Sequence, residues 1–225
     1  MHAYILKESD SELRVAASPE STKKMVEMGL SVSVQTTAGD KSNFSDESYA
    51  ACGAEIFENT TEIANADIVI KVNKPTNEEI SSMKDGALFI GSLDPYNSNE
   101  TISNLKEKGV TSFAMELMPR ITRAQSMDIL SSQANLAGYK AVVESFSAFE
   151  KAIPMMMTAA GTIPAAKVLV VGAGVAGLQA IATAKRMGAI VFATDVRMAS
   201  KEQVESLGGK FLTVEGAENL ETEGG

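Results

Sequence analysis

The chain has 225 residues, 44% of them hydrophobic and 22% charged, a composition typical of a globular protein long enough for two domains. Its net charge of −9 argues against nucleic acid as a partner, because an acidic surface repels phosphate. The single cysteine excludes a disulfide framework, and the single histidine, His2, lies at the terminus, so neither a histidine base nor a histidine metal site is expected.

Before residue 118 the sequence alternates short β-rich runs with helical segments. Several helices have clear boundary signals, such as Ser18-Pro19 before the first helix and Gly29 and Gly109 after two of them. This alternation predicts a parallel α/β domain with helices on both faces of its sheet. Strands are expected at 3–6, 31–36, 55–57, 67–72, 87–91 and 110–117, and helices at 18–28, 46–52, 61–65, 77–83 and 99–108.

Residues 122–151 contain no proline and only one glycine, Gly138, and are expected to form one long helix that links two domains. Thr122 and Gln125 have the spacing of a capping box at its start. About 29 residues at roughly 1.5 Å each would give a length near ~40 Å. The run Met155–Met157, just beyond this helix, is expected to fill gaps in a core. The side expected to face the core carries Met127, Leu130, Ala134, Ala137, Ala141 and Phe149.

The segment Lys167–Arg197 has the pattern of a dinucleotide-binding βαβ unit. Its apolar run, typical of a buried parallel strand, leads into Gly172-Ala-Gly174-Val-Ala-Gly177, then a helical stretch, then a second β-rich run ending at Asp195. The glycines allow a tight turn, close approach of the backbone to a pyrophosphate and close packing of helix on strand, while the helix N-terminus favours phosphate. The expected cofactor-binding residues here are Gly172, Gly174, Val175, Ala176, Gly177, Asp195, Val196 and Arg197.

Asp195 is expected to select the nucleotide. Its carboxylate can accept hydrogen bonds from ribose hydroxyls and would repel a 2′-phosphate, which favours NAD over NADP. Arg197 lies close by and could in principle accommodate a 2′-phosphate, but an acid at the end of the strand is the stronger signal.

The C-terminal region contains only half of a dinucleotide-binding fold. Expected strands at 168–171, 190–194 and 211–214, with helices at 175–187 and 201–207, make one βαβαβ unit, whereas the complete fold has six strands. The sequence is therefore expected to be a fragment of a longer chain. It predicts two Rossmann-like parallel α/β domains, the second incomplete: an N-terminal domain at 1–119, a loop and linking helix at 120–151, and an NAD-binding domain at 152–225.

Neither a signal peptide nor a membrane span is expected. The N-terminus is strand-like and soon becomes charged. The most apolar region, residues 152–178, is interrupted by Pro154, Pro164 and Lys167. Any association with a membrane is therefore expected to depend on a partner.

Three segments, Met115–Asp128, Ser131–Lys140 and Met157–Gly161, closely resemble the NAD(H)-binding domain I of the alpha subunit of proton-translocating NAD(P) transhydrogenase. The resemblance covers essentially the whole chain, and alanine dehydrogenase shares this two-domain architecture. It implies direct hydride transfer between NADH and NADP⁺ bound on a partner domain, coupled to inward proton movement by a membrane domain. It also implies a homodimer in the cytoplasm, held at the inner membrane by its partner.

By the same resemblance, the segment that follows residue 119 lies over the nicotinamide. Because hydride passes directly between the two rings, such a site needs groups that position them instead of an acid or a base. Family members continue past the position of Gly225 into a glycine–tyrosine loop that closes over NAD(H), so this chain is expected to bind NADH more weakly than a longer form. The catalytic residues implied are Arg120, Gln125, Asp128 and Ser131, and Ile121 and Thr122 complete the nicotinamide-binding set.

Two alternative functions stay open on the sequence. An alanine dehydrogenase must bind a carboxylate, for which Arg14 is available, and must also move a proton. Asn73, however, replaces the middle lysine of that family's Lys-Val-Lys-Glu-Pro pattern, and Gly91–Asp94 lacks its histidine. A non-catalytic NAD-binding module would share the βαβ unit but would not exchange hydride with a partner, and the motif at 120–128 argues against it.

Overall fold

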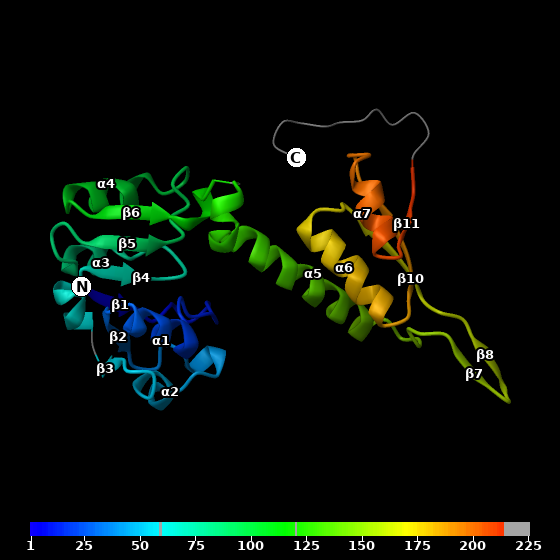
Figure 1. The fold of residues 1–225 in the computed structure, drawn as a ribbon, viewed down its shortest axis with the longest axis horizontal. Coiled ribbons are helices and arrows are strands. Elements are labelled where there is room, and N and C mark those ends of the chain that lie inside the picture. Colours follow the sequence, from blue (N-terminus) through cyan, green and yellow to red (C-terminus); the bar gives the residue numbers. More distant parts are fainter. Residues whose placement is uncertain (59, 120, 214–225) are drawn as a thin grey trace. The chain divides into compact units, whose positions relative to one another are not determined.

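The structure is a computed structural model, and it describes residues 1–58, 60–119 and 121–213 (Figure 1). The chain divides into two compact units, Met1–Asp128 and Ile129–Gly225. Within the described ranges, no helix is both long enough and apolar enough to cross a membrane.

The first unit is built on a parallel sheet of six strands, coloured blue to green in Figure 1. The strand order is β3-β2-β1-β4-β5-β6, so the chain runs from β1 to one edge and then continues on the other side of β1. This arrangement confirms the parallel α/β fold predicted from the alternation of strands and helices. The strands are β1 (His2–Ile5), β2 (Ser31–Gln35), β3 (Glu55–Phe57), β4 (Ile68–Ile70), β5 (Leu88–Gly91) and β6 (Thr111–Ala114).

Adjacent residues of a strand point to opposite faces of a sheet, and in this sheet apolar side chains pack against other elements on both faces. In β1, Tyr4 packs in a core cluster with Val69 and Phe89, whereas the next residue, Ile5, packs in another cluster with Val34. The helices of this unit are α1 (Pro19–Glu27), α2 (Asp46–Ala50), α3 (Asn77–Ser82) and α4 (Asn99–Glu107), with short 3-10 helices η1 (Asp40–Ser42), η2 (Thr60–Asn65) and η3 (Met115–Leu117).

The second unit contains a parallel sheet of order β11-β10-β9, as the predicted βαβαβ unit requires. β9 pairs with β10 through Val168 and Val191, and β10 pairs with β11 through Ala193 and Phe211. Val214, the predicted end of the third strand, lies outside the described residues. The elements are α5 (Ile129–Ala148), β7 (Met156–Thr158), β8 (Gly161–Ile163), β9 (Lys167–Val171), α6 (Val175–Arg186), β10 (Ile190–Thr194), α7 (Ser200–Ser206) and β11 (Lys210–Phe211).

The long helix begins later and ends earlier than the sequence predicts. Thr122–Met127 form a separate 3-10 helix, η4, and α5 begins only at Ile129, so the prediction of one helix over 122–151 is wrong. The backbone of Asp128 is extended, with φ −76° and ψ 93°, and this interrupts the helical hydrogen-bond ladder. The expected capping box is also wrong, because Ile121 holds the N-cap position and makes no side-chain cap bond. Serine, threonine and aspartate side chains compete for backbone hydrogen bonds and weaken a helix in this stretch.

The buried side of α5 also differs from the prediction. Its buried residues are Gly138 and Val142, and Phe146 packs against the same core cluster. These residues are spaced by four, as neighbours on one helix face are. Leu130, which the sequence predicts to face the core, is instead 48% exposed. Apolar residues occur all around this helix, so hydrophobic pattern alone does not indicate which side is covered.

The run Met155–Met157 does not lie in a core, so that prediction is wrong as well. β7 and β8 pair in antiparallel fashion and form a hairpin that the sequence did not predict (Figure 1). All three methionine side chains are exposed, that of Met157 by 72%. A two-stranded ribbon cannot bury both of its faces by itself, which leaves these side chains on the surface of the chain.

Candidate nucleotide-binding site

The glycine turn after β9 lies at the end of the candidate site where the sequence predicts that an anion binds. Gly172 has a φ of +96°, a conformation that favours glycine over every other residue. Its N–H donates to the carbonyl oxygen of Thr194 at 2.8 Å, which ties the turn to the end of β10. The helix α6 then begins at Val175, with Gly174 as its N-cap.

The first turn of α6 presents N–H groups that have no acceptor within the helix, as the first turn of every α-helix does. They belong to the three residues 175–177, since the N–H of Leu178 is the first to donate within the helix, to the carbonyl oxygen of Gly174 at 2.8 Å. Gly174 has no side chain to cap them, and a Cβ atom built there would meet nothing within 4 Å. Uncapped N–H groups at the positive end of a helix, next to open space, fit an anion such as a pyrophosphate.

Gly177 is a glycine for a different reason. A Cβ atom built on Gly177 would lie 1.8 Å from the carbonyl oxygen of Gly172. Any side chain there would push α6 away from the glycine turn, so the contact between helix and turn requires glycine. Protein packing therefore accounts for Gly177, whereas the space at Gly174 is available to a ligand.

Asp195 follows β10 and is tied to the same turn. Its Oδ2 accepts a hydrogen bond from the N–H of Ala173 at 2.6 Å, and its Oδ1 accepts one from the N–H of Arg197 at 2.8 Å. The guanidinium of Arg197 also pairs with the carboxylate, with Nε 3.1 Å from Oδ1. The side-chain pairing with Arg197, together with the two backbone N–H groups and against the opposing effect of burial, lowers the pKa of Asp195 to about 2.

The residues expected at the nicotinamide are divided between the two units. Gln125 lies in η4 and Asp128 directly after it, both in the first unit, whereas Ser131 lies in the first turn of α5 in the second. Ile121, just before η4, is 50% exposed, and Thr122 is the first residue of η4. Arg120 lies outside the described residues. The structure thus brings the glycine turn and Asp195 together within one unit, and holds Gln125 and Asp128 in the other.

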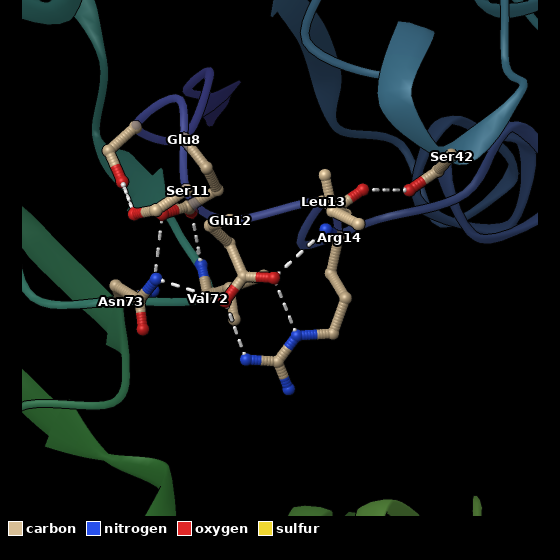
Figure 2. Close-up of polar contacts among 9 residues, drawn as sticks. Glu8, Ser11, Glu12, Leu13, Arg14, Ser42, Val72 and Asn73 are labelled. Atoms are coloured by element: carbon tan, nitrogen blue, oxygen red, sulfur yellow. Dashed lines mark hydrogen bonds and ion pairs between the residues drawn. The ribbon is translucent and has the colours of Figure 1, made fainter. Parts of the chain in front are cut away.

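An acidic side chain that was not predicted from the sequence lies at the centre of the first sheet. Glu8 follows β1, and its carboxylate accepts hydrogen bonds from the N–H groups of Val72 at 2.6 Å and Asn73 at 3.4 Å, just after β4 (Figure 2). The order of strands reverses between β1 and β4, and in open α/β sheets this is where ligands bind. Here the carboxylate of Glu8 lies at that position, and burial raises the pKa of Glu8. Its position after the first strand was the only signal in the sequence.

The neighbouring arginine is also engaged within the chain. Arg14 donates to Glu12 through Nε at 2.8 Å and Nη2 at 2.7 Å, and the side-chain amide of Asn73 donates to the same carboxylate at 3.2 Å (Figure 2). The Arg14 guanidinium lowers the pKa of Glu12 to about 2. Arg14, the group with which an alanine dehydrogenase would bind its carboxylate substrate, is therefore already paired with Glu12. Among the described residues, histidine, cysteine, aspartate and glutamate form no group of three or more that could hold a metal ion.

Two family models match the chain, and together they cover most of it. The model described as alanine dehydrogenase/PNT, N-terminal domain, matches residues 4–137, and that described as alanine dehydrogenase/PNT, C-terminal domain, matches residues 141–223. The chain is 52% identical over 222 residues to an NAD(P) transhydrogenase alpha subunit of Rhodospirillum rubrum, covering 95% of this chain and 58% of that protein. It is 30% identical over 209 residues to alanine dehydrogenase 2 of Staphylococcus aureus, covering 91% and 56%.

A solved structure agrees with these sequence matches. The crystal structure of transhydrogenase from Sinorhizobium meliloti has a TM-score of 0.91 and 55% identity with this chain, and the match covers 95% of this chain and 64% of that one. The chain therefore spans between 56% and 64% of the length of these proteins.

Proposed function

The chain belongs to the alanine dehydrogenase/PNT family, and from this premise we propose that it is the NAD(H)-binding component of a proton-translocating NAD(P) transhydrogenase. The observation that carries the proposal is the geometry after β9 and β10. An uncapped helix N-terminus and an ionised carboxylate, Asp195, are tied to one glycine turn by the hydrogen bond from Ala173. A dinucleotide requires such a pair: a group that binds its pyrophosphate and, close by, a group that binds its ribose.

The residues of the second unit hold the non-reacting half of the nucleotide. The N–H groups at 175–177 bind the pyrophosphate, and Gly174 leaves room for its approach. Asp195 accepts the hydroxyl groups of the adenosine ribose, and its negative charge disfavours a 2′-phosphate. Because its pKa is about 2, this carboxylate is ionised throughout the neutral range.

The reacting end is positioned by the segment that joins the two units. Arg120, Ile121, Thr122, Gln125, Asp128 and Ser131 orient the nicotinamide. When bound, NADH supplies a hydride from C4 of its ring to C4 of the NADP⁺ ring on a docked partner domain, yielding NAD⁺ and NADPH. No proton is exchanged with the protein in this step, so the residues act by orientation, and a site without histidine is sufficient.

The proposed assembly includes partners and a second copy of the chain. The NADP(H)-binding domain and the membrane domain complete the enzyme, and the membrane domain couples hydride transfer to proton movement. The chain stays on the cytoplasmic side and reaches the inner membrane only through these partners. The exposed hairpin of β7 and β8, with Met156, Met157 and Ile163 on its surface, supports a homodimer, because it offers an apolar surface that a second copy can cover.

The test is stopped-flow measurement of hydride transfer from NADPH to the acetylpyridine analogue of NAD⁺, whose reduced form has its own absorbance. The 225-residue chain, and a form lengthened to match its relatives, are each mixed with a transhydrogenase NADP(H)-binding domain. We expect transfer that falls at least about tenfold in Gln125→Ala, because a misplaced ring no longer reaches its partner. Lys23→Ala, at an exposed position on α1, is the matched control and should transfer at the wild-type rate.

Two results would contradict the proposal. NADH binding without any transfer in either form would indicate a non-catalytic NAD-binding module. Reduction of NAD⁺ that depends on added alanine would indicate an alanine dehydrogenase, against the engagement of Arg14 by Glu12.

A further inference from the structure

The Asp195 carboxylate has all of its acceptor positions filled. A carboxylate has about four lone-pair directions, two on each oxygen. Oδ1 accepts from the N–H and the Nε of Arg197 at 2.8 and 3.1 Å. Oδ2 accepts from the N–H of Ala173 at 2.6 Å and from Nη2 of Arg197 at 3.4 Å. A ribose hydroxyl can therefore bind only after one of these donors has left.

The four donors are of two kinds. Two are backbone N–H groups, of Ala173 in the glycine turn and of Arg197 just after β10, and they are fixed by the fold. The other two, Nε and Nη2, lie at the end of the flexible Arg197 side chain, which is 31% exposed. The same side chain covers the carboxylate, since the Asp195 side chain is only 5% exposed.

The number and kind of the exchangeable donors match the ligand. An adenosine ribose offers two neighbouring hydroxyls, at C2′ and C3′, which can replace two N–H donors while the backbone bonds keep the carboxylate in place. The guanidinium thus makes, within the chain, the contacts that a ribose would make on binding.

We propose that Arg197 is a gating residue that competes with the adenosine ribose for Asp195, occupying the carboxylate in the empty site and leaving it when a nucleotide binds. The proposal rests on the proposed function, because it assigns a regulatory role to one end of the same nucleotide site. The competition lowers affinity for NAD(H) below what Asp195 alone would give, and thereby favours release after each hydride transfer.

The experiment compares wild type with Arg197→Met, which keeps most of the side-chain length but has no N–H donor. Binding of NADH is followed by fluorescence, and binding of AMP, 2′-deoxy-AMP and 2′,3′-dideoxy-AMP by calorimetry. We expect Arg197→Met to bind NADH and AMP about 3- to 10-fold more tightly, to gain less for 2′-deoxy-AMP, and to gain nothing for the dideoxy compound. A general effect on folding or charge would change all of these affinities alike.

Two controls separate the gate from other effects. Lys201→Met removes a positive charge from an exposed position on α7 and should not tighten the binding of any of these nucleotides. In an Asp195→Asn background, Arg197→Met should give no gain, because the contested carboxylate is gone. Circular dichroism of every variant establishes that it is folded.

The outcomes distinguish the two proposals. If wild type binds NADH and Arg197→Met binds it equally well or more weakly, the gate is wrong and the proposed function stands. An equal gain with dideoxy-AMP would also overturn the gate, since no ribose hydroxyl would be involved. If folded wild type binds neither NADH nor AMP, the nucleotide site itself is wrong, and the gate with it.

Discussion

A Cβ atom built on Gly138 of α5 would lie 2.1 Å from the carbonyl oxygen of Ala176 on α6. The two helices therefore meet backbone to backbone, and only glycine fits at the crossing. Ala176 lies in the first turn of α6, among the N–H groups proposed to bind the pyrophosphate. The position of this first turn of α6 is thus set partly by a residue about 40 positions earlier in the chain.

Gly138→Ala should therefore destabilise the second unit, although alanine is the better helix former. Relief of the clash requires α5 and α6 to separate, and we expect a loss of about 2 kcal/mol or more in the free energy of unfolding, measured by denaturant titration. Ala137→Ser adds one heavy atom at an exposed neighbouring position and should cost no more than about 0.5 kcal/mol. Equal stability of the two variants would show that the helices do not cross so closely.

Gly177→Ala and Gly174→Ala should separate packing from ligand binding. A methyl group on Gly177 meets the Gly172 carbonyl oxygen, so this variant should lose about 2 kcal/mol of stability and most of its NADH affinity. A methyl group on Gly174 meets no protein atom, so stability should fall by only about 0.5–1 kcal/mol, the ordinary cost of alanine in place of glycine at an N-cap. It would nevertheless stand where the pyrophosphate approaches, and NADH affinity should fall at least about tenfold. Unimpaired NADH binding by Gly174→Ala would place the pyrophosphate elsewhere.

The pairing of Asp195 with Arg197 should appear in the pH dependence of stability. The pKa of Asp195 is lowered from 3.8 to about 2, so the folded state favours the ionised form. This stabilisation is complete above about pH 4 and is lost as the pH falls toward about 2. The difference in unfolding midpoint between wild type and Asp195→Asn should be constant from about pH 7 to about pH 5 and should shrink below about pH 4. A difference that grows on acidification would mean that the pKa is raised instead.

Glu8 should show the opposite dependence on pH. Its side chain is buried, burial raises its pKa, and its ionised form is therefore less favourable in the folded state than in water. The stability that the protonated form contributes is present at low pH and is lost as the pH rises through the raised pKa. Glu8→Gln keeps an acceptor oxygen for the Val72 N–H and has no charge, so its stability relative to wild type should rise as the pH increases above about 4.5, the ordinary pKa of a glutamate.

Glu8→Ala serves as the comparison for that variant. It leaves the partly buried Val72 N–H without its acceptor and should cost about 1–3 kcal/mol at every pH. If the two substitutions prove equally destabilising at neutral pH, the hydrogen bond from Val72 contributes nothing measurable.

The hairpin of β7 and β8 should control the oligomeric state. Met157 is 72% exposed, and a charge placed there could not be covered by a second copy without a desolvation cost. Met157→Asp is expected to sediment as a monomer in analytical ultracentrifugation under conditions where wild type is a dimer. Met28→Asp, at a position 76% exposed just after α1, should leave the dimer intact. Sedimentation of wild type as a monomer would contradict the proposed homodimer.

Much of the fold could be predicted because its signals are local. Ser18 accepts a hydrogen bond from the N–H of Ser21 and Pro19 opens α1, so that helix begins where the sequence predicts its start. The strand–glycine–helix run after Lys167 was also predictable, since an apolar strand, a turn with positive φ and a helix start each restrict the residues that can form them. The prediction that this strand is buried is wrong, because Leu169 and Val171 of β9 are 59% and 78% exposed. The sequence prediction was wrong where local conformational preferences compete. The extended backbone at Asp128 separates η4 from α5, although the sequence predicts a single helix there.

The sequence by itself determined the two parallel α/β units, the glycine turn and the position of Asp195, because periodicity, turn conformation and strand ends are properties of neighbouring residues. Only the tertiary structure decided which side of α5 is buried, that Met155–Met157 lie exposed at the start of a hairpin, and that Glu8 fills the centre of the first sheet. Each of these depends on how closely segments distant in the chain approach one another, and that distance is set by packing between them and not by the residues of either segment alone.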